Sequence, residues 1–173
     1  MTANERRQKI TAYLKGSISP VTATALAAKF SVSRQIIVGD IAILRASGVD
    51  ISATPRGYTM EAAAAAGIYC EKTIACRHDF QGLKTELYTI VDNGAQAINV
   101  TVEHSVYGQI SAPLHLFSRF DVDQFLAKLE HSSAKPLCDL TDGIHLHKIR
   151  CPDADAADRI LQQLTDAGIL VSQ

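Results

Sequence analysis

Apolar and polar residues alternate along the first 60 positions with the period of short amphipathic helices. The pattern predicts helices over residues 4–15, 22–30 and 34–46. Ser33 is a good N-cap for the third helix, because its hydroxyl can accept a hydrogen bond from a free backbone N–H of the first turn. Ile37, Ile41 and Leu44 lie on one stripe of that helix, which predicts the face that packs into a core.

Two short β-prone stretches follow the third helix and flank the segment Thr-Pro-Arg-Gly at residues 54–57. Three short helices and a hairpin predict a winged helix-turn-helix, whose third helix enters the major groove of DNA. An arginine can fork onto guanine and a glutamine can pair with adenine, whereas an arginine on the wing reaches phosphate or the minor groove. The alternative is a three-helix packing module with solvated arginines. The candidate DNA-binding residues are Ser33, Arg34, Gln35, Val38 and Arg56.

The second part of the chain begins after an alanine-rich segment, residues 61–67, that we expect to be a short helical spacer. It divides a domain of residues 1–60 from one of residues 68–173. Strands and helices then mix without strict alternation, which predicts an α+β domain. Asp79 and Asp121 are the expected caps of two helices, and Ile98, Val100 and Val102 are the alternating apolar residues expected to share one face of a strand. The predicted strands are residues 68–76, 97–103, 109–117, 144–151 and 169–171, and the predicted helices are residues 80–93, 121–130 and 153–167.

Charge is distributed unevenly about the same boundary. Residues 1–60 hold eight basic and three acidic residues, a net charge of +5, whereas the remainder holds nine and fifteen, a net charge of −6. This balance is expected if only the first domain approaches a polyanion, although a chance distribution is the alternative. No stretch approaches the roughly 18 apolar residues of a membrane span, so we expect a cytoplasmic protein with no membrane partner.

Histidines in the second domain are the most informative candidates for chemistry. His145 and His147 alternate in a predicted strand, so both imidazoles project to one side and can hold one divalent cation. His78 ends a strand just before a helix, and Glu86 lies about two turns into that helix at the border of its apolar stripe. A carboxylate in such a place is costly to desolvate unless it is paired or bound to metal.

Three imidazoles and one carboxylate leave one or two coordination positions open and suit Zn, Ni, Co, Fe or Mn. The two alternating histidines alone are a weak signal, because such pairs are common on the surface of strands. The four cysteines lack CxxC spacing, which indicates thiols rather than a disulfide framework or a metal site. These cysteines are Cys70, Cys76, Cys138 and Cys151.

Two segments carry a resemblance to a known family. Residues 32–45 with residues 53–58 resemble the winged helix-turn-helix of bacterial transcription regulators, particularly niacin-responsive repressors, although Gly39 stands where we expect a longer polar side chain. His78, Glu86 and residues 102–108 and 141–147 look like the three-histidine (3H) domain of NiaR-type regulators. The second resemblance spans about residues 68–171.

The resemblance implies a domain that binds a divalent metal and senses nicotinic acid. It makes His78, Glu86, His145 and His147 the metal ligands, with nicotinate completing the coordination shell. His104 is then the candidate for contact with the effector, and a satisfied core or loop histidine is the alternative. Ser105 replaces a proline that is usual in the family, so the loop after His104 is expected to be less rigid.

Together these features predict a metal-dependent, nicotinate-responsive repressor of niacin uptake or NAD biosynthesis genes that binds operator DNA as a homodimer. One alternative is a regulator that senses the metal itself. Another is a metalloenzyme fused to a DNA-binding domain, for which Asp79, Glu103 and Asp142 are the nearby candidates for a general base. None of them stands in a recognised hydrolytic motif, so we expect a protein that is not an enzyme.

Overall fold

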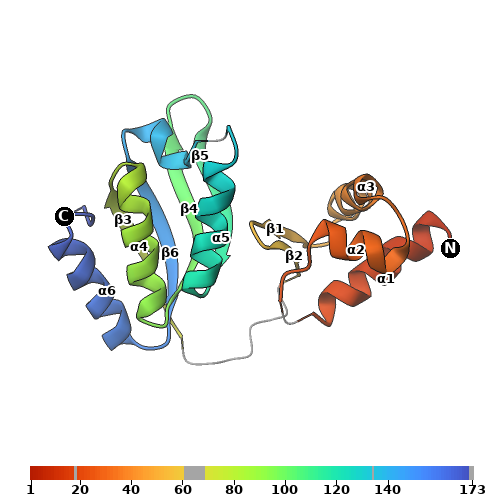
Figure 1. The fold of residues 1–173 in the computed structure, drawn as a ribbon, viewed down its shortest axis with the longest axis horizontal. Coiled ribbons are helices and arrows are strands. Elements are labelled where there is room, and N and C mark those ends of the chain that lie inside the picture. The colour runs from red at the N-terminus through yellow and green to blue at the C-terminus, as the bar shows by residue number, and fades with distance from the viewer. Residues whose placement is uncertain (18, 61–68, 134, 172–173) are drawn as a thin grey trace. The chain divides into compact units, whose positions relative to one another are not determined.

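The computed structural model describes residues 1–17, 19–60, 69–133 and 135–171 of the chain (Figure 1). They belong to two compact units, residues 1–67 and 68–173. The predicted spacer at residues 61–67 lies outside the described residues. Within the described ranges, no helix is both long enough and apolar enough to cross a membrane.

The first unit has three helices and a two-stranded hairpin, as the sequence pattern predicts. Its elements are α1 (Ala3–Lys15), α2 (Ala23–Phe30), α3 (Arg34–Ala46), β1 (Ser52–Thr54) and β2 (Gly57–Thr59). The hydroxyls of Thr22 and Ser33 each accept a hydrogen bond from the first turn of the following helix, which explains where α2 and α3 begin. The core is built from Ile10, Leu14, Leu26, Ile37 and Ile41, all at most 1% exposed.

The hairpin is fixed to the helices by backbone hydrogen bonds. Val21 and Tyr58 exchange two N–H···O bonds of 2.8 Å, which join β2 to the loop before α2. Gly57 fits this approach because a Cβ there would lie 2.5 Å from the backbone of Val21. A partly buried ion pair between Arg6 Nε and Asp40 Oδ2, 2.6 Å apart, joins α1 to α3. The hairpin and the helices therefore form one packed body.

The second unit is a four-stranded antiparallel sheet in the order β3-β6-β4-β5, with three helices over one face (Figure 1). Its strands are β3 (Cys70–Arg77), β4 (Gln96–His104), β5 (Gly108–Leu116) and β6 (Ile144–Cys151). Its helices are α4 (Phe80–Asp92), α5 (Arg119–Glu130), α6 (Ala154–Asp166) and the short 3₁₀ helix η1 (Leu137–Thr141). The predicted α+β class is confirmed, and the core lies between the sheet and the helices.

Three details of this unit differ from the sequence-based prediction. Ser118, not Asp121, is the N-cap of α5, because its hydroxyl accepts from Asp121 N while the carboxylate of Asp121 accepts from Phe117 N. Ile98 does not share the inward face, because a bulge between Ala97 and Asn99 shifts the register of β4. The expected last strand at residues 169–171 is reduced to one isolated bridge, Cys76 with Leu170, at the edge of β3.

Gly39 provides a test of the helical assignment. It lies in the middle of α3 with nothing within 4 Å of the position of a Cβ. Gly39→Ala should therefore stabilise the first unit by about 0.5–1 kcal/mol, because glycine loses more backbone entropy in a helix. Amide hydrogen exchange in α3 should slow about two- to five-fold. Gly48→Ala is the matched control and should not stabilise the unit, because the φ of +87° at Gly48 makes alanine strained there despite the open space. Faster exchange in Gly39→Ala would contradict the helical assignment.

Candidate functional site

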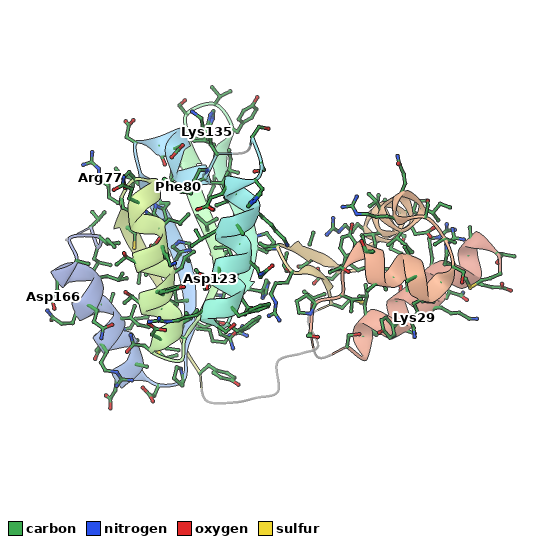
Figure 2. All side chains as sticks on the ribbon, viewed as in Figure 1. Lys29, Arg77, Phe80, Asp123, Lys135 and Asp166 are labelled. Atoms are coloured by element: carbon green, nitrogen blue, oxygen red, sulfur yellow. The ribbon has the colours of Figure 1, made fainter. Side chains whose placement is uncertain are left out.

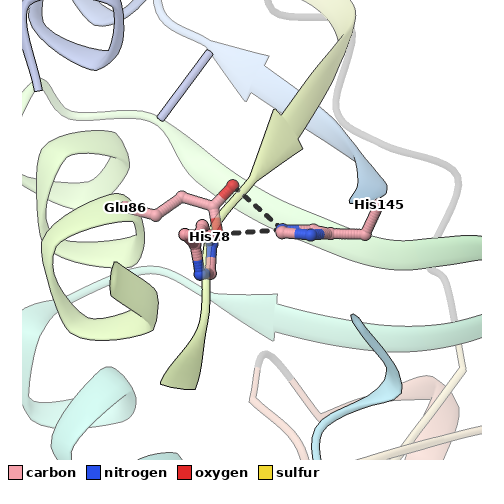
Figure 3. Close-up of side chains that lie close together, drawn as sticks. All are labelled: His78, Glu86 and His145. Carbon is pink, nitrogen blue, oxygen red and sulfur yellow. Dashed lines mark hydrogen bonds and ion pairs between the residues drawn. The ribbon is translucent and has the colours of Figure 1, made fainter. Parts of the chain in front are cut away.

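Four side chains that are distant along the chain meet inside the second unit. His78 lies between β3 and α4, Glu86 lies on α4, and His145 and His147 lie on β6. Glu86 is fully buried, and His145 and His147 are at most 2% exposed. Figure 3 shows Glu86, His78 and His145 pointing toward one another from three different segments. The distances to Glu86 Oε2 are 2.7 Å from His78 Nε2, 3.1 Å from His145 Nε2 and 3.3 Å from His147 Nε2. We call these four residues the His-Glu cluster.

The other ring nitrogen of each histidine in the cluster is bound to a backbone carbonyl. The Nδ1···O distances are 2.7 Å from His78 to Asp79, 2.9 Å from His145 to Gly143 and 2.6 Å from His147 to Asn99. A carbonyl only accepts hydrogen bonds, so each Nδ1 must carry the proton. In the neutral ring, Nε2 then carries a lone pair that is directed at the carboxylate. Each imidazole is thus presented as a ligand.

The backbone carbonyl of Asn99 is available to His147 because the side chain of Asn99 takes its place in the sheet. At the bulge in β4, the side-chain oxygen of Asn99 accepts the hydrogen bond from Lys148 N at 3.1 Å. The side chain replaces a backbone partner in the ladder between β4 and β6. The backbone oxygen of Asn99 can therefore bind His147 Nδ1 instead.

Two glycines leave the space that His78 occupies. A Cβ at Gly82, in the first turn of α4, would lie 2.5 Å from the Cβ of His78. A Cβ at Gly143 would lie 2.5 Å from the backbone oxygen of His78, and φ there is +86°. His78 is therefore held between the start of α4 and the turn before β6.

Electrostatics in the cluster are dominated by the buried carboxylate. Burial by itself raises the pKa of Glu86, but His147, His145 and His78 together hold it well below its usual range. Burial lowers the pKa of His78 and His147, but Glu86 outweighs this effect and raises the pKa of both. In the absence of a bound cation, protonation of His78 or His147 can thus balance the charge of Glu86.

The donor set fits a divalent metal. Ligand atoms of His78, Glu86 and His145 lie within 4.8 Å of one another. His147 Nε2 is buried and has no hydrogen-bond partner in the part of the chain that the structure describes, although it lies at ion-pair distance from Glu86. A buried nitrogen without a hydrogen-bond partner is rare in proteins, and a bound cation would provide a partner for this one. Imidazole nitrogen and carboxylate oxygen are ligands that zinc and similar ions prefer.

A mostly apolar cavity of about 130 Å³ lies beside His145 and His147. An apolar cavity of about 150 Å³ is large enough to bind benzene, so this volume corresponds to one small ring. Sequence reasoning missed the cavity, because its walls come from residues that are far apart in the sequence. It is lined by Leu83, Val100, Ala112, Leu114, Phe125, Leu129, Lys135, Pro136, Leu137, Cys138, His145 and His147.

His104 lies at the end of β4 and is not among the residues that line this cavity or form the cluster. Its Nδ1 accepts hydrogen bonds from the backbone N–H groups of Val106 and Tyr107, at 3.2 and 3.3 Å. Its ring lies 5.0 Å from that of Tyr107. This geometry favours the alternative of a loop histidine that orders the hairpin between β4 and β5.

Two buried cysteines lie near the cluster. Cys76 is fully buried and stands opposite His145 in the β3–β6 pairing, and burial together with Glu86 raises the pKa of its thiol. Burial also raises the pKa of Cys138, which lines the cavity. Both groups are therefore protonated thiols near neutral pH. This agrees with the prediction that the cysteines are thiols.

Residues at the start of α3 in the first unit are open to solvent. Arg34, Gln35 and Val38 are exposed, whereas Ser33 uses its hydroxyl to accept from Ile36 N. Arg56 is partly exposed in the turn between β1 and β2. The structure therefore brings Arg34, Gln35 and Val38 to one accessible helix end, as a recognition helix requires.

Comparison with known proteins covers both units. The family pattern of the 3H domain matches residues 71–173, and that of an HTH domain matches residues 6–59. The chain is 43% identical over 172 residues to the Transcription repressor NadR of Bacillus subtilis (strain 168), which covers 99% of this chain and 95% of that protein. It is 39% identical over 169 residues to the Probable transcription repressor NiaR of Thermotoga maritima, covering 98% of this chain and 95% of that protein.

The pKa shifts predict that the metal-free protein is less stable at higher pH, and that the stabilisation by added zinc grows with pH. The lowered pKa of Glu86 contributes stability above its ordinary value of 4.5, and this is lost as the pH falls through the lowered pKa. The raised pKa values of His78 and His147 contribute stability below 6.5, and this is lost as the pH rises through them. Metal-stripped protein should therefore unfold at lower temperature at about pH 8 than at about pH 5.5. Added zinc should raise the unfolding temperature more at the higher pH, because metal requires neutral imidazoles.

Thermal unfolding in chelator and in zinc, at both pH values, measures these two trends. His131→Ala is the control, because His131 is an exposed histidine at the end of α5. It should leave both trends unchanged. A zinc effect that does not grow with pH would contradict the assignment of the cluster.

Proposed function

This chain belongs to the NiaR-type family of transcription repressors, in which an HTH domain precedes a 3H domain, and from that membership we propose that it is a metal-dependent repressor whose affinity for DNA responds to nicotinic acid. We further propose that it controls genes of niacin uptake or NAD biosynthesis. The observation that carries the proposal is the His-Glu cluster. Three Nε2 atoms and one buried carboxylate face one another beside a cavity the size of a single ring.

We assign the metal to His78, Glu86, His145 and His147. A bound Zn, Ni, Fe, Co or Mn ion would supply a Lewis-acidic centre with an open position for one ligand atom. The backbone carbonyls on the three Nδ1 atoms orient the rings for this role. The apolar walls of the neighbouring cavity exclude water from a flat ligand and favour an aromatic ring.

We assign DNA contact to the first unit. Arg34 and Gln35 are exposed at the N-terminus of α3, and the residues before position 61 carry a net charge of +5. A homodimer would present two copies of α3 to successive major grooves of an operator. Nicotinate can act as a co-repressor only if it binds the dimer arrangement that fits DNA more tightly than the arrangement that does not. This difference in binding free energy limits how much nicotinate can increase the affinity for DNA.

The central test measures operator affinity with and without nicotinate in buffer that contains metal. Nicotinate should tighten operator binding about 10- to 100-fold, which corresponds to the usual range of coupling free energies. The double variant His145→Ala, His147→Ala should lose this response and should keep its affinity for nonspecific DNA, because the first unit is unaltered. His131→Ala should respond like the parent protein. An operator affinity that nicotinate leaves unchanged would remove the co-repressor role.

Arg34 tests the DNA-binding surface separately. Arg34→Ala should weaken operator binding by about 1–3 kcal/mol and relax the preference for the base it contacts, if its guanidinium forks onto guanine. Arg34→Lys is the matched control, since it keeps the charge and loses the fork. Binding to operators with single base changes distinguishes the two. Equal losses on operator and random DNA for Arg34→Ala would mean that Arg34 contacts phosphate alone.

A further inference from the structure

The lining of the cavity beside the His-Glu cluster combines polar and apolar side chains. His145 and His147, which belong to the cluster, are among its residues. Most of the others are aliphatic or aromatic, with Leu83, Val100 and Phe125 among them. A ligand that fills this space must therefore be small and largely apolar, and any charge on it needs a polar or charged partner in the lining.

Lys135 is the one side chain with a permanent charge among the described residues that line the cavity. It also lines a polar recess together with Arg77, His78, Asp139 and Asp142. The cavity and the recess therefore share Lys135, which places this residue at the boundary between them. In Figure 2, Lys135 is labelled at the same end of the unit as Arg77.

The backbone conformation at Lys135 is restricted by the residue that follows it. Pro136 follows it and is the N-cap of η1, which supplies the cavity residues Leu137 and Cys138. A residue before proline is biased to extended conformations, so the path of the chain at Lys135 is restricted. Lys135 is thus carried by a segment that is anchored through the buried Cys138.

The polar recess carries charges of both signs. It includes the carboxylates of Asp79, Asp139 and Asp142 together with Arg77 and the exposed Lys135. Asp79 already accepts hydrogen bonds from Gln81 N and Gly82 N. Of the two basic residues, Lys135 is the one that also lines the cavity, so a carboxylate on a ligand there can be attracted by its ammonium group, whereas a neutral amide gains little from that charge.

We propose that Lys135 binds the carboxylate of the effector while its ring fills the apolar cavity, and that Lys135 thereby selects nicotinic acid over nicotinamide. The inference rests on the proposed function, because it takes nicotinate as the ligand. It adds the residue that distinguishes the acid from its neutral amide. The site is compatible with such a ligand, because the cavity volume corresponds to one small ring and Lys135 offers one positive charge.

The experiment is calorimetric titration of the full-length, zinc-loaded protein with nicotinate and, separately, with nicotinamide. Lys135→Ala should weaken nicotinate binding about 10- to 100-fold, the usual contribution of a charge-assisted hydrogen bond, and should leave nicotinamide binding unchanged. Lys135→Arg should retain most of the preference for the acid. Lys84→Ala is the matched control, because it removes an exposed lysine of the same unit on α4. Elemental analysis of each variant should give equal zinc content.

Two results would overturn the role of Lys135 and leave the proposed function intact. In one, Lys135→Ala binds nicotinate as tightly as the parent does, which would place the carboxylate at the His-Glu cluster. In the other, the variant loses nicotinate and nicotinamide binding equally, which would indicate a role in packing alone. A parent protein that holds zinc and binds no nicotinate would overturn both this inference and the proposed effector.

Discussion

The second unit depends on one constraint: three imidazoles have their Nδ1 protons fixed by backbone carbonyls, so their Nε2 atoms must face the same buried carboxylate. A neutral imidazole in this state cannot donate to Glu86, and Glu86 itself can only accept. The arrangement is therefore unfavourable unless a positive charge lies among the four groups. Protons on the histidines supply that charge in one state, and a metal ion would supply it in the other.

The fold meets this constraint through its irregular features rather than its regular ones. The bulge in β4 frees the backbone oxygen of Asn99 for His147. The left-handed turn at Asp142 and Gly143 places a carbonyl against His145 and leaves room for His78. Periodicity in the sequence does not mark these positions. In the structure they orient the cluster, and the same turn lies next to η1, which lines the cavity.

The sequence predicts the parts of this protein that depend on local periodicity. The helices, the hairpin and the alternating His145 and His147 follow from periods of 3.6 and 2. Glu86 was expected at the border of an apolar stripe, but it is fully buried, because three histidines from other segments offset the cost of its burial. The bulge that displaces Ile98, the cap at Ser118 and the loss of the last strand depend on contacts with distant segments. Periodicity carries no information about such contacts. For the same reason, the cavity and the position of Lys135 in its lining could be identified only from the structure.

A cation held by three imidazoles and a carboxylate, with a position left for the effector, is the central element of the proposed function. X-ray absorption spectroscopy at the edge of the bound metal tests this site most directly, with and without nicotinate. The expected first shell contains nitrogen and oxygen atoms with the scattering pattern of about three imidazoles, and it changes when nicotinate is added. A spectrum with no imidazole scattering, or one in which sulfur ligands dominate, would contradict the proposed site.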